Sequence, residues 1–112
     1  TRGLFNIDRL KKMKSTSRII NVARGGIIDE KDLSVALNSD IIAGAAIDVF
    51  ENEPYSGKLT EIDRCLLTAH MGSMSIECRS KMEIEATEEA IRFLTGKPLQ
   101  SEVPQSEYEI QS

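Results

Sequence analysis

Three short apolar segments constrain the fold of this chain most strongly, because each leads into a polar or charged residue near glycine or proline. The segments are residues 19–23, the second half of 41–50, and 64–69. Strands of a buried parallel sheet have this composition, and ligand sites form at their C-terminal ends. We therefore expect Arg24, Glu53 and His70 to meet in one crevice. An arginine, a carboxylate and a histidine together can bind an organic acid and move its proton.

The spacing of apolar residues predicts helices between and after these strands. Residues 1–14 carry apolar side chains at every third position, Asp29 is the expected N-cap of a second helix, and residues 76–95 form a long helix that Gly96 ends. The expected inward-facing positions of the second and third helices are Leu33, Ala36, Leu37, Met82, Ala86, Ala90, Phe93 and Leu94. The element order α-β-α-β-β-α predicts half of a doubly wound α/β sheet with parallel strands and flanking helices.

The chain is expected to divide into three parts. Residues 1–75 would form the α/β half-domain, residues 76–99 the long helix and its end, and residues 100–112 a tail that is ordered only where it docks. Removal of the other half of a doubly wound sheet leaves an unpaired edge strand and an uncovered apolar face. We therefore expect a homodimer.

Composition excludes several classes of function. The net charge is −4 and no dense basic stripe occurs, which argues against binding to nucleic acid or to an anionic membrane surface. No apolar run approaches the roughly 18 residues of a membrane span. Cys65 and Cys78 lack the spacing of metal ligands, so we expect no metal site and two reduced structural thiols, as in a reducing cytoplasm.

Taken singly, the candidate site residues leave alternatives open. Arg24 is either a surface arginine at a turn or a fork for a carboxylate, and the two glycines after it would let a substrate approach the backbone. His70, the only histidine, is either structural or catalytic, and Glu53 alone is most simply a solvated carboxylate. Asp48 lies in an apolar run, where an unpaired charge is costly, so it needs either a backbone cap or a ligand amide.

Three motifs in order resemble a known family. They are Asn21-Val-Ala-Arg-Gly-Gly-Ile-Ile-Asp-Glu, Ala43-Gly-Ala-Ala-Ile-Asp-Val-Phe-Glu-Asn-Glu-Pro and Thr68-Ala-His-Met-Gly-Ser. Together they closely resemble the D-isomer-specific 2-hydroxyacid dehydrogenases, which include phosphoglycerate and glycerate dehydrogenases, and the likeness covers about residues 1–99. The resemblance implies the C-terminal half of a Rossmann-like NAD-binding domain, followed by a helix that crosses back to a substrate domain.

The resemblance also implies a role for each site residue. Arg24 would hold the carboxylate of a small 2-hydroxy or 2-keto acid, His70 would exchange a proton with its C2 oxygen, and Glu53 would pair with His70 and favour its protonated form. Asp48 would bind the nicotinamide carboxamide of NAD, with NADP not excluded. The other residues implied to line the nicotinamide site are Val22, Ala23, Arg24, His70, Met71, Gly72 and Ser73.

Two departures from the family pattern limit what the resemblance implies. Ala69 stands where the family usually has proline, which loosens the turn without removing a functional group. The dinucleotide fingerprint G-x-G-x-x-G does not occur in these 112 residues. We therefore expect the full-length parent to be an NAD(P)-dependent oxidoreductase and the isolated chain to be inactive. The alternative is a non-catalytic binding or oligomerisation module, like the corepressors of this family.

Overall fold

The computed structural model describes residues 1–106, so the last six residues of the predicted tail lie outside the described residues. By its internal contacts the chain forms two compact units, residues 1–72 and residues 73–112, and each is described here by itself. No helix of the described part is long and apolar enough to cross a bilayer.

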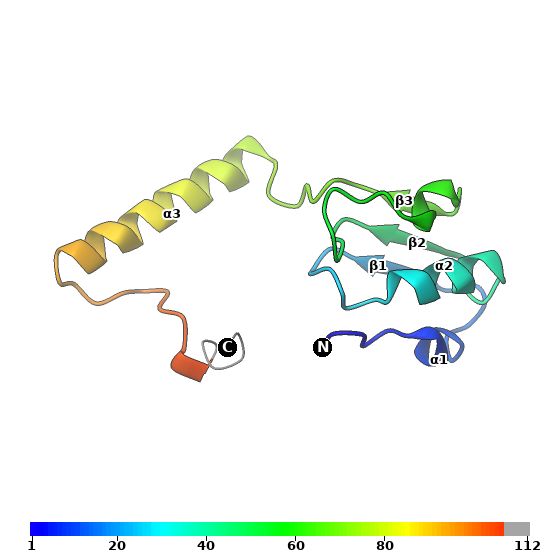
Figure 1. Cartoon of the computed structure of the whole chain (residues 1–112). Coiled ribbons are helices and arrows are strands. Elements are labelled where there is room, and N and C mark those ends of the chain that lie inside the picture. The colour runs from blue at the N-terminus through cyan, green and yellow to red at the C-terminus, as the bar shows by residue number, and fades with distance from the viewer. Residues whose placement is uncertain (107–112) are drawn as a thin grey trace. The chain divides into compact units, whose positions relative to one another are not determined.

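A three-stranded parallel sheet organises the first unit (Figure 1). Its strands are β1 (Arg18–Asn21), β2 (Gly44–Ile47) and β3 (Cys65–Leu67), in the spatial order β1-β2-β3. The prediction of a parallel α/β sheet with flanking helices is confirmed. Each strand is shorter than its apolar run, because the residues after it leave the ladder and form the turns of the candidate site.

The sheet register places alternate residues on opposite faces. The row Ile19–Ala45–Cys65 faces the core, and each of its members is 8% exposed. The neighbouring row joins Ile20, Ala46 and Leu66, of which Ile20 is 69% and Leu66 is 65% exposed. Within the first unit, the helices therefore cover only one face of the sheet.

Two helices and a 3₁₀ turn build the core on the covered face: α1 (Ile7–Leu10), α2 (Glu30–Asn38) and η1 (Lys58–Glu61). Asp29 caps α2 as predicted, and its side chain accepts the Asp32 N–H at 2.9 Å. The Asp32 carboxylate in turn accepts the Ile7 N–H at 2.8 Å and so ties α2 to α1. The fully buried core side chains are Leu10, Leu33, Ala36, Leu37, Ile42 and Leu59.

The predicted helix over residues 1–14 is wrong in extent, since α1 spans only four residues. The segment before it begins with a turn, in which the Leu4 N–H bonds to the Thr1 carbonyl at 3.1 Å. The same segment is tied to residues 26–27, because the Gly3 N–H bonds to the Gly26 carbonyl at 2.7 Å and the Phe5 N–H to the Ile27 carbonyl at 3.0 Å. These long-range backbone bonds replace the helical bonds that the three-residue spacing of apolar side chains suggested.

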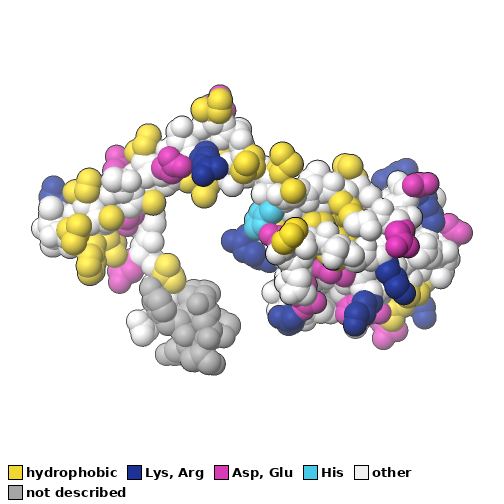
Figure 2. All heavy atoms as spheres, turned by 45° about the horizontal axis from the view of Figure 1, so that its top comes forward, with side chains coloured by type: hydrophobic (Ala, Val, Ile, Leu, Met, Phe, Trp, Pro, Cys, Tyr) yellow, Lys and Arg dark blue, Asp and Glu magenta, His cyan; other side chains and the backbone are white. Residues whose placement is uncertain are grey.

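The second unit consists of α3 (Ile76–Leu94) and the segment that follows it. Ser75 caps the helix, and Gly96 follows its end with a positive φ of 68°, as expected of a C-terminal glycine. The predicted inward-facing positions are wrong for this helix taken alone, because none of its residues is buried. Met82 is 53%, Phe93 73% and Leu94 82% exposed, and apolar side chains gather along the helix surface in Figure 2.

Candidate active site

The carboxyl ends of the three strands meet at one edge of the sheet, where backbone bonds continue beyond the ladder. The Asp48 N–H donates to the Asn21 carbonyl at 2.9 Å, and the His70 N–H donates to the Asp48 carbonyl at 2.9 Å. Asp48 therefore bridges the chain leaving β1 and the chain leaving β3. This edge brings the predicted site segments next to one another, as the strand pattern indicated.

The turn that carries Arg24 is built on the side chain of Asn21, which is only 6% exposed. The Asn21 Nδ2 donates to the Arg24 carbonyl at 3.0 Å, and its Oδ1 accepts the Ala23 N–H at 3.2 Å. The sequence analysis gave Asn21 no role of its own. Asn21 could have been identified from the sequence, because a short amide side chain inside an apolar strand needs polar partners.

Arg24 itself is exposed, and its guanidinium donates to the Ala23 carbonyl at 2.7 Å. No ion pair within residues 1–106 involves it, so its charge is available to an anion. No hydrogen bond of the described part joins Arg24 to Glu53 or His70. The structure thus places Arg24 at the predicted edge without a direct contact to the other two residues.

Gly25 has a different function from the one expected. A Cβ atom at this position would lie 2.0 Å from the Phe50 carbonyl oxygen and 2.7 Å from the Glu51 nitrogen. The space beside Gly25 is therefore filled by the chain's own backbone and does not admit a substrate. The glycine allows the Arg24 turn to dock on the loop that leads to Glu53.

Glu53 and His70 form a hydrogen-bonded pair, with His70 Nδ1 3.0 Å from Glu53 Oε2. The other carboxylate oxygen, Oε1, accepts the Phe50 N–H at 2.9 Å. The bond from Phe50 and then the bond from His70 lower the pKa of Glu53, so the carboxylate is ionised near neutral pH. An ionised carboxylate only accepts hydrogen bonds, so we assign the proton to Nδ1. Nε2 is then free to exchange a proton with a ligand, and half of the His70 side chain is exposed (Figure 2).

The turn after β3 is anchored on the Asp48 carboxylate. Oδ1 accepts the Thr68 hydroxyl at 2.5 Å and the Met71 N–H at 2.9 Å, and Oδ2 accepts the Gly72 N–H at 3.3 Å. The Thr68 hydroxyl, followed by the Met71 amide, lowers the pKa of Asp48 although burial opposes this shift. The sequence analysis left open whether Asp48 caps the backbone or binds a ligand amide. In the structure its carboxylate caps the backbone amides of Met71 and Gly72. The sequence analysis missed the role of Thr68. Its hydroxyl lies beside Asp48 because of the register between strands β2 and β3, which the sequence alone does not reveal.

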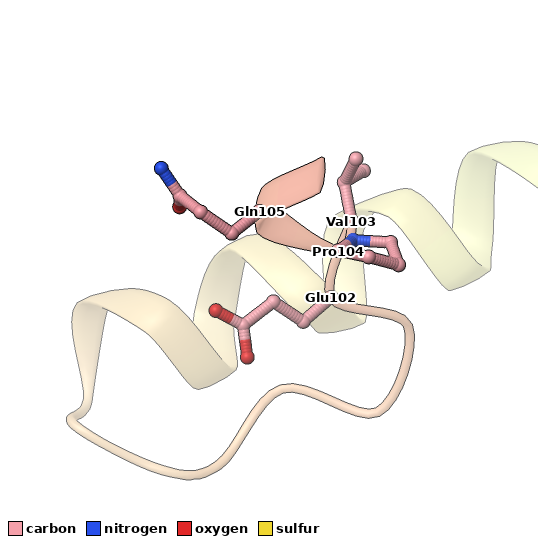
Figure 3. A pocket seen from close by; sticks show the side chains of 4 residues that line it. All are labelled: Glu102, Val103, Pro104 and Gln105. Atoms are coloured by element: carbon pink, nitrogen blue, oxygen red, sulfur yellow. The ribbon is translucent and has the colours of Figure 1, made fainter. Parts of the chain in front are cut away.

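A pocket of about 580 Å³ opens beside the His70–Glu53 pair. One wall is aromatic, with the rings of Phe50 and Tyr55 stacked at a centroid distance of 4.5 Å. A second hollow, in the other unit, is lined by Glu102, Val103, Pro104 and Gln105 (Figure 3). It contains a single carboxylate with no basic residue beside it in the lining, so it has no candidate acid–base pair.

Other sequence predictions bear on metals and thiols. No group of residues in the described part has the composition of a metal site. Cys65 and Cys78 are both free thiols, and burial raises the pKa of Cys65 to about 11, which makes that thiol unreactive. Ser73 begins the second unit, and its predicted contact with the cofactor stays a prediction.

Comparisons with known proteins agree with this fold. Residues 1–72 match the family model described as D-isomer specific 2-hydroxyacid dehydrogenase, NAD binding domain. The chain is 41% identical over 104 residues to D-3-phosphoglycerate dehydrogenase of Synechocystis sp., a match that covers 92% of this chain and 19% of that protein. It is 42% identical over 98 residues to glyoxylate reductase of Pyrococcus furiosus, covering 87% of this chain and 29% of that protein.

A solved structure matches as well. The D-isomer specific 2-hydroxyacid dehydrogenase from Xanthobacter autotrophicus, in complex with NADPH and MES, superimposes with a TM-score of 0.77 at 38% identity, covering 93% of this chain and 43% of that chain. The parallel sheet and these matches identify the first unit as part of a Rossmann-like NAD-binding domain. The chain belongs to the D-isomer specific 2-hydroxyacid dehydrogenase family. It spans 19% and 29% of the length of the two curated relatives described above.

Proposed function

We propose that this chain supplies the acid–base and substrate-binding residues of an NAD(P)-dependent oxidoreductase acting on a small 2-hydroxy or 2-keto acid. The observation that carries the proposal is the 3.0 Å contact between His70 Nδ1 and Glu53 Oε2. No hydrogen bond within residues 1–106 involves Nε2, and the His70 side chain is half exposed. A histidine oriented by a carboxylate is suited to exchange a proton with a carbonyl oxygen.

Each residue has a defined part in the proposed reaction. In the reductive direction, His70 Nε2 donates its proton to the C2 carbonyl oxygen of the acid. Glu53 holds the ring in place and stabilises its positive charge, while Arg24 binds the carboxylate of the substrate through its forked guanidinium. The nicotinamide cofactor, when bound, supplies the hydride that C2 receives. In the oxidative direction His70 takes the proton back.

The carboxyl ends of the strands have features that fit the nicotinamide half of the cofactor. Val22 is 68% exposed and offers an apolar surface to an aromatic ring. Among residues 1–106, the Asp48 Oδ2 accepts only the long bond from Gly72, so it keeps acceptor capacity for an amide N–H. The further residues proposed to line this site are Ala23, Arg24, His70, Met71, Gly72 and Ser73. The glycine fingerprint that would hold the pyrophosphate does not occur in these 112 residues.

The test is the variant His70→Gln in the protein that carries this chain. Oxidation of NADH with glyoxylate, pyruvate or hydroxypyruvate should fall by roughly 100- to 10,000-fold in kcat, which is the usual contribution of a general acid–base residue. The dissociation constant for NADH should change much less than kcat does, because His70 Nε2 exchanges its proton with the substrate and not with the cofactor. Thr87→Val on α3 is the control and should retain activity. A glutamine variant with wild-type kcat would overturn the proposal.

A second candidate function is self-association without catalysis. It is favoured by the exposed row Ile20–Ala46–Leu66, which lies on a sheet whose strand β1 has no pairing partner on one side within the described part. We propose that a second copy of the chain covers this face, with α3 as the element that reaches across.

The two free thiols suit a protein that works in a reducing cytoplasm.

A further inference from the structure

We propose that Thr68 is a positioning residue for His70, because its hydroxyl fixes the carboxylate on which the histidine turn is built. The inference deepens the proposed function and rests on it, since positioning matters for the reaction only if His70 is the acid–base group. The hydrogen-bond pattern that supports it stands independently of any activity.

Asp48 holds the turn through both its backbone and its side chain. Its carbonyl accepts the N–H of His70 at 2.9 Å, and its carboxylate accepts the N–H groups of Met71 at 2.9 Å and Gly72 at 3.3 Å. Three consecutive backbone donors therefore converge on one residue. The position of the turn depends on the orientation of the Asp48 side chain.

The backbone of His70 makes this anchoring necessary. Its φ of +53° lies in the left-handed region, which residues other than glycine rarely adopt. Such a conformation persists only where neighbouring contacts hold it. The same conformation directs the ring so that Nδ1 reaches Glu53. A turn that relaxed to an extended backbone would carry the imidazole away from its carboxylate partner.

Thr68 is the one side chain that donates a hydrogen bond to the Asp48 carboxylate among the described residues. Asp48 is 7% exposed, and no lysine or arginine of the described part pairs with it. Its negative charge is therefore stabilised by neutral hydrogen-bond donors, namely one hydroxyl and two backbone amides. The hydroxyl is also the largest cause of the lowered pKa of Asp48. Loss of this donor leaves the carboxylate free to turn away from the Met71 and Gly72 amides.

Thr68 is itself an exposed residue, so substitution there does not require the core to repack. Valine keeps the shape and removes the hydroxyl, serine keeps the hydroxyl, and cysteine offers only a weak donor. Thr87→Val is the matched control, because the Thr87 hydroxyl donates to the Glu83 carbonyl within α3 and lies outside the turn.

The test uses nuclear magnetic resonance on the 112-residue chain, in which His70 gives the only imidazole signals. In Thr68→Val we expect amide exchange at Met71 to accelerate by about tenfold, as for loss of one charge-assisted hydrogen bond. The Nδ1–H signal of His70 should broaden or disappear. Thr68→Ser should restore both signals, Thr68→Cys should lie between, and Thr87→Val should match the wild type.

Three results would each overturn the proposal. The first is a valine variant whose Met71 exchange and His70 ring signals equal those of the wild type. The other two decide the matter even if the valine variant does not fold: a serine variant that lacks the wild-type signals, and a cysteine variant identical to the wild type.

In the protein that carries the chain, Thr68→Val should lower kcat more than it raises KM, with rescue by serine. Unchanged kcat with altered ring signals would contradict the acid–base role of His70 while leaving the hydrogen-bond network intact.

Discussion

Gly25 lies so close to the backbone of Phe50 that a Cβ atom there would sit 2.0 Å from the Phe50 carbonyl oxygen. This contact docks the turn that carries Arg24 on the loop that carries Glu53. Two of the three proposed catalytic residues are therefore held in register by packing of backbone on backbone. The third, His70, reaches Glu53 through a hydrogen bond.

The first prediction concerns this docking. Gly25→Ala should lower the free energy of unfolding by about 2–4 kcal/mol, because a methyl group cannot fit without moving the Phe50–Glu51 backbone. Gly72→Ala is the control, since a Cβ atom there would meet Asp48 Oδ2 at an ordinary 3.8 Å. Urea unfolding followed by circular dichroism measures both. Equal stability of the two variants would contradict the tight contact.

The second prediction concerns Arg24. Arg24→Lys in the protein that carries this chain should lower turnover by roughly 10- to 1,000-fold, because an ammonium group cannot make the forked contact with a carboxylate. Arg79→Lys is the control, since Arg79 is an exposed arginine that pairs with Glu83 on α3. Steady-state kinetics with NADH and a 2-keto acid provides the measurement. A lysine variant with wild-type kcat and KM would contradict the proposed role of Arg24 in binding the substrate carboxylate.

The three strands could be predicted from the sequence, because short apolar runs and the polar residues after them carry that information locally. The pairing of Glu53 with His70 was expected only from the resemblance to a known family. The hydrogen-bond partners of Asn21 and Thr68 could not be predicted. Their hydrogen bonds depend on the turn conformation and the register between strands, and no local pattern encodes either property. Gly25 was expected to let a substrate approach the backbone, whereas the structure shows that the glycine lets the chain's own backbone pack there.

The errors in the helices have a common physical cause. The spacing of apolar residues indicates which side chains favour burial, but it does not indicate which part of the structure buries them. In residues 1–14 the segment before α1 bonds to residues 26–28, and this competes with helix formation. In α3 the apolar positions, such as Met82 and Phe93, are exposed within their own unit.

The third prediction is a pH dependence of stability. The pKa of Glu53 is lowered in the folded chain from its ordinary value of 4.5, chiefly by the Phe50 amide and then by His70. The unfolded chain therefore binds a proton at this carboxyl more readily. The stabilisation is present above the ordinary pKa and is lost as the pH falls through the lower pKa of the folded state.

The measurement is the thermal midpoint between about pH 6 and about pH 3. The wild type should lose stability on acidification, and Glu53→Gln should lose less, because glutamine does not titrate. Glu85→Gln on α3 serves as the control, since the one ion pair of Glu85 in the described part is a long surface contact with Lys81 at 3.7 Å. Identical acid profiles for the Glu53→Gln variant and the wild type would mean that the hydrogen bonds to Glu53 do not stabilise the fold.

The last prediction is that the chain associates with itself. The row Ile20–Ala46–Leu66 exposes apolar side chains on the uncovered sheet face, and β1 offers unpaired backbone groups at its edge. Sedimentation at low micromolar concentration should therefore detect a dimer or a larger species. Leu66→Lys should shift the chain toward monomer without unfolding it, because residue 66 is 65% exposed and points away from the core. Val35→Lys is the control, an exposed apolar position on α2 that should leave association unchanged. A wild-type chain that sediments as a well-folded monomer would show that this face does not bind a second copy.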